Sequence, residues 1–213
     1  MTNALENPYI MKICPDKTLL ESLLECQSLL EVVQKGLANY LEIKRKAFPR
    51  FYFLSDDELL EILAQTKNVQ AVQPHLRKCF ENIQMVRFES DLQITRMYSA
   101  EGEEVIFRPP MYPERSVEYW LSDLERVMCN TIREIIGDAL DVIDSTPRKE
   151  WVYMWPGQVT LCCGQTYWTA HVENGIRTNT LAAYYKELLG QLDNLRELVR
   201  GPQTEIQRLM LEA

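Results

Sequence analysis

Two small groups of residues in this sequence have types and spacings that could support chemistry. The first is His75 with Cys79, whose four-residue step would place both side chains on one face of a helix, as two metal ligands require. A structural zinc site needs about four ligands, and no second pair accompanies these two. We therefore interpret them as a partly buried histidine next to a core cysteine, and we predict no metal site.

The second group is a cluster of carboxylates, Glu101, Glu103 and Glu104. Paired carboxylates can carry out general acid–base catalysis where burial or a neighbouring charge shifts their pKa values. These three fall at the expected tip of a hairpin, which is exposed to solvent. Two interpretations stay open: a charged edge that discourages stray β-pairing, or a contact for a basic surface.

The motifs of nucleotide-binding and hydrolytic enzymes are missing from these 213 residues. No glycine precedes a lysine, so there is no P-loop, and no G-x-G-x-x-G occurs. The only histidines, His75 and His171, leave little material for an acid–base or nucleophilic triad. The sequence therefore predicts a non-catalytic segment that binds no cofactor of its own.

Composition and charge narrow the possible partners. The net charge of −8 argues against nucleic acid, because neutralising phosphates needs a basic surface. No apolar run approaches the roughly 18 to 20 residues that span a bilayer, so no membrane contact is predicted. The first residues lack the features of a signal peptide, and six cysteines without a C-x-x-C pair suggest reduced thiols in a cytosolic compartment.

Most of the chain carries the three- and four-residue period of amphipathic helices. This period predicts long helices over residues 17–46, 116–144 and 181–199, and shorter ones that begin near Ser55 and Pro74. The periodic pattern runs on towards Ala213 with no stop signal, so the chain looks truncated. The predicted fold class is mainly α, with elongated helical bundles.

Residues 84–108 differ from the rest because they are rich in β-branched and aromatic side chains with partial alternation. Gly102 can supply the left-handed residue of a short hairpin loop, so we predict a small antiparallel β-hairpin insertion. Pro109, Pro110 and Pro113 close this segment. The predicted domains are residues 1–110, a helical bundle with the hairpin near 84–108, and residues 111–213, a long-helix bundle.

Aromatic residues are expected to anchor the helix junctions and the core. An aromatic run follows the first helix at residues 48–54, and four tryptophans lie further along. Residues 151–172 fit either a strand or a helix on pattern alone. The candidate anchors are Phe48, Pro49, Arg50, Phe51, Phe53, Trp155, Pro156 and Trp168.

Four stretches, in order along the chain, resemble the linker region of dynein heavy chains. The most specific is residues 44–60, KRKAFPRFYFLSDDELL. It is followed by residues 72–83, VQPHLRKCFENI, by residues 99–103, SAEGE, and by W-P-G-Q at 155–158 with Y-W-T at 167–169. The W-P-G-Q form looks more like axonemal than cytoplasmic heavy chains. The resemblance spans nearly the whole chain.

The resemblance implies a rod-like, arched linker that lies across the AAA+ ring of the same heavy chain and bends as nucleotide changes in that ring. It places the protein in the cytoplasm, on the cytoskeleton of a ciliary or flagellar axoneme. ATP and Mg would belong to the ring, and the microtubule would be reached only through the parent chain. The resemblance also implies that residues 156–173 are helical. It further implies that the hairpin at 94–107 contacts the ring, with candidate contacts Arg96, Glu101, Gly102, Glu103 and Glu104.

Two functions therefore follow from the sequence. The first is a mechanical lever that transmits ring motion, and the alternative is a static helical scaffold or adaptor of a cytoskeletal complex. A lever must bend somewhere, and the proline cluster suggests a hinge at residues 108–115. Docking to AAA+ modules that depends on nucleotide would favour the lever.

Overall fold

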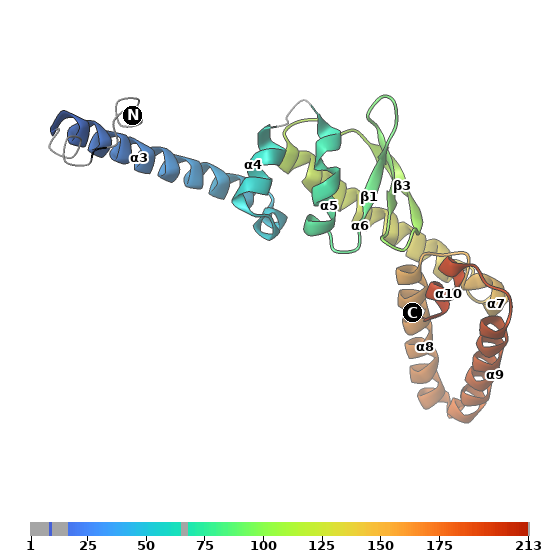
Figure 1. The fold of residues 1–213 in the computed structure, drawn as a ribbon. Helices are drawn as coiled ribbons and strands as arrows, with labels where there is room; N and C mark the ends of the chain where they lie inside the picture. Colours follow the sequence, from blue (N-terminus) through green and yellow to red (C-terminus); the bar gives the residue numbers. More distant parts are fainter. Residues whose placement is uncertain (1–8, 10–16, 65–67, 213) are drawn as a thin grey trace. The chain divides into compact units, whose positions relative to one another are not determined.

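The computed structural model describes residue 9, residues 17–64 and residues 68–212 (Figure 1). The chain divides into two compact units, Met1–Tyr52 and Phe53–Ala213. The sequence suggested a division between residues 110 and 111 instead, and that assignment of domains stays a prediction. Each unit is described below by itself.

The first unit is dominated by one long helix, α3 (Lys17–Ala47), which confirms the predicted helix over 17–46. Its last turn carries Lys44, Arg45 and Lys46, whose charges favour the negative end of the helix dipole. A short 3-10 helix, η1 (Pro49–Phe53), follows. Most apolar side chains of α3 are exposed, so the described part of the chain does not supply the neighbours that its composition predicts.

The second unit begins with short helices. Helix α4 (Asp56–Ala64) starts with the expected capping box, in which the Ser55 amide donates to Glu58 at 3.0 Å and the Glu58 amide donates to the Ser55 hydroxyl at 3.3 Å. The 3-10 helix η2 (Val69–Val72) leads into α5 (Gln73–Cys79), which has a proline in its first turn, as predicted.

A three-stranded antiparallel sheet follows, made of β1 (Met85–Phe88), β2 (Ile94–Tyr98) and β3 (Glu104–Met111) in that order. The predicted hairpin corresponds to β2 and β3. Its last strand is longer than expected, because Pro109 and Pro110 lie within β3 and Met111 still pairs with Ile94. The first part of the proposed 108–115 hinge is therefore strand rather than a free connection.

The outer edge of β1 is closed by a side chain. The Gln73 carboxamide oxygen accepts the Val86 N–H at 3.1 Å, and its NH₂ group donates to the Val86 carbonyl at 2.5 Å. An amide side chain thus takes the place of a fourth strand at this residue. It satisfies backbone groups that would otherwise offer a site for stray pairing.

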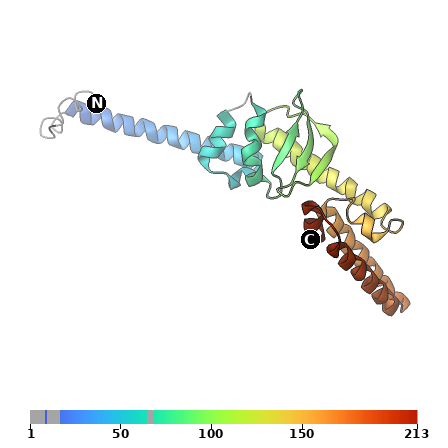
Figure 2. The ribbon, with the colours of Figure 1, turned by 45° about the vertical axis from the view of Figure 1, so that its right-hand side comes forward.

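Helix α6 (Val117–Asp141) packs against both the sheet and the later helices of the second unit. It runs along one face of the sheet and continues beyond it towards the later helices (Figure 2). Trp120, Leu121 and Leu124, all nearly inaccessible, pack at the end that covers the sheet. The predicted helix over 116–144 is confirmed except for its last turn, since residues after Asp141 form turns.

The remaining helices pack at the other end of α6. Helix α7 (Arg148–Trp151) places the Trp151 indole N–H 3.0 Å from the Ala139 carbonyl, one of the last acceptors of α6. Helices α8 (Gly157–Thr178) and α9 (Leu181–Arg200) lie side by side in Figure 1, and α10 (Glu205–Glu212) follows. The mainly α fold with a small β insertion is confirmed, and so is the helix expected over 156–173.

Candidate functional site at the hairpin tip

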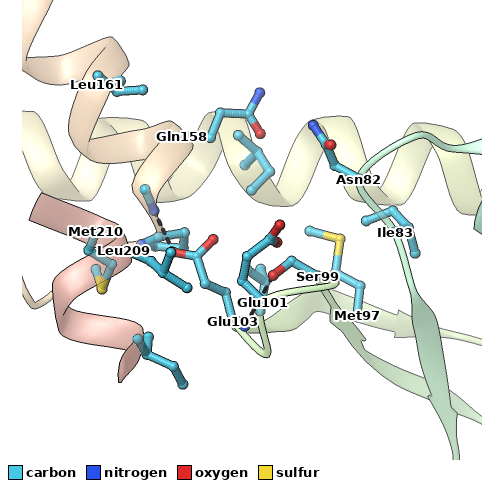
Figure 3. Close-up of a pocket in the computed structure, with 15 residues that line it drawn as sticks. Asn82, Ile83, Met97, Ser99, Glu101, Glu103, Gln158, Leu161, Leu209 and Met210 are labelled. Carbon is cyan, nitrogen blue, oxygen red and sulfur yellow. Dashed lines mark hydrogen bonds between the residues drawn. The ribbon is translucent and has the colours of Figure 1, made fainter. Parts of the chain in front are cut away.

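The loop that joins β2 to β3 lies against the first turn of α8 and beside α10. A cavity of about 380 Å³ separates these elements (Figure 3). Apolar side chains form most of its wall, and two carboxylates, two side-chain amides and one hydroxyl stand at its sides. The lining includes Ile83, Met97, Val105, Ile132, Leu161, Leu209 and Met210, with Asn82, Ser99, Glu101, Glu103 and Gln158.

The conformation of the tip follows from its sequence. Gly102 has φ of 90°, a backbone conformation that a residue with a Cβ rarely adopts. The Ser99 amide donates to the Glu103 carbonyl at 3.0 Å, and the Glu103 amide donates to the Ser99 hydroxyl at 3.2 Å. These two hydrogen bonds tie Ser99 to Glu103 across the loop, and the Glu103 side chain is held on the side of α8.

Glu103 makes the contact that joins this loop to α8. Its Oε1 atom accepts a hydrogen bond of 2.8 Å from the Gly157 N–H, the first amide of α8. The N-cap residue of that helix, Pro156, offers no side-chain hydrogen bond, so a carboxylate 54 positions away in sequence caps the helix instead. The negative charge also meets the positive end of the helix dipole.

The Glu103 carboxylate lies close to the Gly157 backbone. A Cβ atom at Gly157 would lie 3.4 Å from Glu103 Oε1 and 4.0 Å from Oε2. These are ordinary van der Waals distances, so the contact itself leaves room for a methyl group at this position. No residue pattern points directly to this pairing, although the absence of Ser, Thr, Asp or Asn immediately before α8 indicates that the cap of this helix comes from elsewhere.

The other predicted contact residues divide between two places. Arg96 and Glu104 form an ion pair across β2 and β3 on the surface of the sheet. Glu101 and Gly102 are exposed at the tip, and Glu101 lines the cavity with Glu103. The structure thus brings part of the predicted set together, and contact of any of them with an AAA+ ring stays a prediction.

The candidate anchors also differ in their surroundings. Phe48 and Phe51 are buried and pack edge to face with ring centroids 5.0 Å apart. Phe53 is 68% exposed, Pro49 is exposed and Arg50 is partly exposed.

Among the tryptophans that were expected in the core, Trp120 and Trp151 are buried, whereas Trp168 is 49% exposed on α8. Burial fails at Trp168 because it lies on the open side of the α8–α9 pair, where it lines a groove with Tyr185 and Leu188. Trp155 is partly buried, next to Pro156 at the start of α8, and its buried indole N–H finds no hydrogen-bond partner among the residues that the structure describes.

An aromatic stack that sequence reasoning missed joins α8 to α9. The His171 ring lies between the Tyr167 and Tyr184 rings, at centroid distances of 3.9 and 5.2 Å. Burial raises the pKa of Tyr167, and its hydrogen bond of 2.6 Å to Asp144 raises it further. Tyr167 therefore stays a neutral donor, which suits a structural role in this stack.

The remaining candidate chemistry is not assembled into a site. His75 and Cys79 are both buried, and the His75 Nε2 atom lies 3.7 Å from a Glu61 oxygen. Within residues 17–64 and 68–212, no three His, Cys, Asp or Glu side chains come close enough to hold a metal ion. Over the same residues, no helix is both long enough and apolar enough to cross a bilayer.

Comparison with known proteins identifies the family. A family model described as dynein heavy chain, N-terminal region 2, matches residues 1–139. The chain is 52% identical over 214 residues to dynein axonemal heavy chain 1 of Rattus norvegicus, and 42% identical over 216 residues to dynein axonemal heavy chain 3 of Homo sapiens. It is 44% identical over 213 residues to dynein axonemal heavy chain 12 of Mus musculus.

These matches cover 100%, 100% and 98% of this chain, but only 5%, 5% and 7% of the three relatives. The chain therefore spans about one-twentieth of the length of the first relatives it matches. The resemblance inferred from the four sequence stretches is confirmed, including its axonemal type. The chain belongs to the dynein heavy chain family.

Proposed function

We propose that this chain is a mechanical linker segment of an axonemal-type dynein heavy chain, which transmits ATP-driven changes of an AAA+ ring into movement along microtubules. In this role the segment is not itself an enzyme. ATP and Mg are bound by the ring of the parent chain, and the microtubule is reached through the parent chain. Its place is the axoneme of a cilium or flagellum, as the names of its relatives suggest.

The observation that carries the proposal is the way α6 supports the second unit. The helix has 25 residues, which corresponds to roughly 37 Å at 1.5 Å per residue. The sheet is attached near its middle through the Arg108 N–H, which donates to Thr131 Oγ1 at 3.0 Å. Helix α7 is attached near its end through Trp151 and Ala139. One continuous helix thus connects two bodies, as a lever requires.

The tip of the hairpin is the surface that we propose for contact with the ring. Glu101, Gly102 and Glu104 are exposed, while Arg96 and Glu104 form an ion pair and Glu103 accepts from Gly157. Because β3 extends to Met111, only residues 112–115 of the proposed hinge at 108–115 lie between β3 and α6.

The experiment is to determine the structure of the parent heavy chain in two nucleotide states and to measure the angle between α6 and the ring. A change in that angle, with the hairpin tip touching the ring in one state, is the expected result. If the angle is the same in both states and the tip never approaches the ring, the segment is a static scaffold. That alternative shares the same architecture and differs only in this behaviour.

A further inference from the structure

We propose that the hydrogen bond between Glu103 and Gly157 is a releasable latch that sets the angle between the sheet and the α8–α9 pair. The inference rests on the proposed lever function, because the angle matters only if the segment changes shape. The latch joins the tip of a loop to the first backbone amide of a helix, with a donor–acceptor distance of 2.8 Å.

The latch spans two bodies that are separately attached to α6. The sheet is held by Thr131 Oγ1, which accepts from the Arg108 N–H at 3.0 Å. Helix α8 is held further along, where Cys163 Sγ lies 3.7 Å from the Ile136 carbonyl. The Glu103–Gly157 contact therefore closes a triangle whose third side is α6. A bend of α6 between Thr131 and Ile136 that opens the angle between the sheet and α8 lengthens the distance between Glu103 and Gly157.

The contact is suited to release because little close packing surrounds it. Beside it lies the cavity of about 380 Å³, so the loop and the first turn of α8 do not form a continuous core. Closely packed interiors have few voids larger than a water molecule. Separating these two surfaces breaks one charge-assisted hydrogen bond and widens a cavity to which Ile206 and Leu209 of α10 also contribute, whereas separating the sheet from α6 would open a packed core.

The same contact is strong enough to bias the shape. Removing an N-cap acceptor costs about 0.5–2 kcal/mol, and a charge at a helix N-terminus adds to this. A difference of one or two kcal/mol corresponds to a factor of roughly 5 to 30 in an equilibrium. We therefore expect that loss of the Glu103 carboxylate shifts the ratio of latched to unlatched chains by roughly 5- to 30-fold.

Hydrogen exchange in the full-length heavy chain tests the latch. The angle of α6 to the ring and the bend of α6 between Thr131 and Ile136 are measured in the same two nucleotide states. The reporters are the amides of Gly157, which donates to Glu103, and of Thr160, which donates to the Pro156 carbonyl at 3.0 Å. In the wild-type protein these amides should exchange faster in the state in which α6 bends. The Glu103→Ala variant should exchange them roughly 5- to 30-fold faster in the straight state.

Two matched pairs of variants identify the contact. Glu101→Ala removes a carboxylate from the same loop and the same cavity wall and should leave the exchange of Thr160 unchanged. Gly157→Ala keeps the amide donor, and its methyl group fits at 3.4 Å from the carboxylate. Gly157→Pro removes the donor, although proline is accepted at the first position of a helix. Proline should therefore reproduce the effect of Glu103→Ala at Thr160, and alanine should not.

The outcomes separate the latch from the lever. If the angle changes with nucleotide but the first turn of α8 is equally protected in both states, the latch is overturned and the lever stands. Equal exchange in the Glu103→Ala and Glu101→Ala variants overturns the latch as well. If the angle never changes, both the lever and a releasable latch are overturned. A coupled change of angle and exchange, lost in Glu103→Ala, supports the proposal.

Discussion

The junction between β3 and α6 depends on one buried hydroxyl. Thr131 is 0% exposed, and its Oγ1 accepts the Arg108 N–H at 3.0 Å. The β2–β3 register pairs Ile94 with Met111 and Arg96 with Ile106, so residues 107–110 oppose a single residue of β2. Arg108 therefore has no assigned partner in the neighbouring strand, and α6 supplies its acceptor.

Thr131→Val keeps the shape of the side chain but removes this acceptor. A partly buried N–H left without a partner costs about 1–3 kcal/mol, because it has lost water and gained nothing. The control is Thr131→Ser, which keeps the hydroxyl and loses one methyl group, at a cost of roughly 0.8 kcal/mol. We therefore expect valine to destabilise the second unit more than serine does.

Urea unfolding of the 213-residue chain, followed by tryptophan fluorescence, measures this difference, since all four tryptophans lie in the second unit. With an m-value of about 2 kcal/mol/M, a loss of about 2 kcal/mol lowers the midpoint by about 1 M. Exchange of the Arg108 amide should accelerate in the valine variant alone. If the valine variant unfolds at the wild-type midpoint, or above the serine variant, the hydrogen bond does not stabilise the junction as argued.

Two further predictions concern side chains on α4, α6 and α9. The hydrogen bond from Lys78, and after it in size the hydrogen bond from the Ser55 amide, lowers the pKa of Glu58 to about 2, below the value of about 4.3 for an unperturbed glutamate. Because the pKa of Glu58 is lower in the folded state, its stabilisation is complete above about pH 5 and disappears as the pH falls towards 2. In acid titrations, the difference in unfolding free energy between wild type and Glu58→Gln should therefore close over that range. A difference that stays constant would contradict this assignment. Leu124→Ala, at a side chain that is 0% exposed, should cost about 2–5 kcal/mol in the same urea assay, whereas Leu189→Ala, at 44% exposure, should cost less than about 1 kcal/mol. Equal costs at the two leucines would mean that the core does not lie where the sheet covers α6.

Signals that act over a few residues were readable from the sequence. The helical period predicted α3, α6 and α9, and the Ser55–Glu58 capping box placed the start of α4. The change to alternating β-branched residues predicted the hairpin. Each of these depends on side chains within one or two turns of each other, so no knowledge of the chain path was needed. Residues 151–172 were ambiguous on pattern, and only the family resemblance favoured the helix that is observed.

Some features were missed because they depend on the neighbour that an element meets. The outer edge of β1 is closed at Val86 by Gln73, which comes from the preceding helix α5. Trp168 and Trp151 are the same residue type, but Trp168 is exposed and Trp151 is buried, because of the two only Trp151 contacts the end of α6. Periodicity tells which face of a helix is apolar, but it does not tell which faces another element will cover.

The sequence by itself determined the mainly helical class, the place of the β insertion and the membership of the dynein heavy chain family, because these follow from local periodicity and from ordered stretches of residues. The tertiary structure alone decided that Glu103 caps α8 at Gly157 and that Thr131 holds β3. Those partners are 54 and 23 positions apart. Their meeting depends on how α6 positions the sheet and α8 in space, and no spacing along the chain encodes that distance.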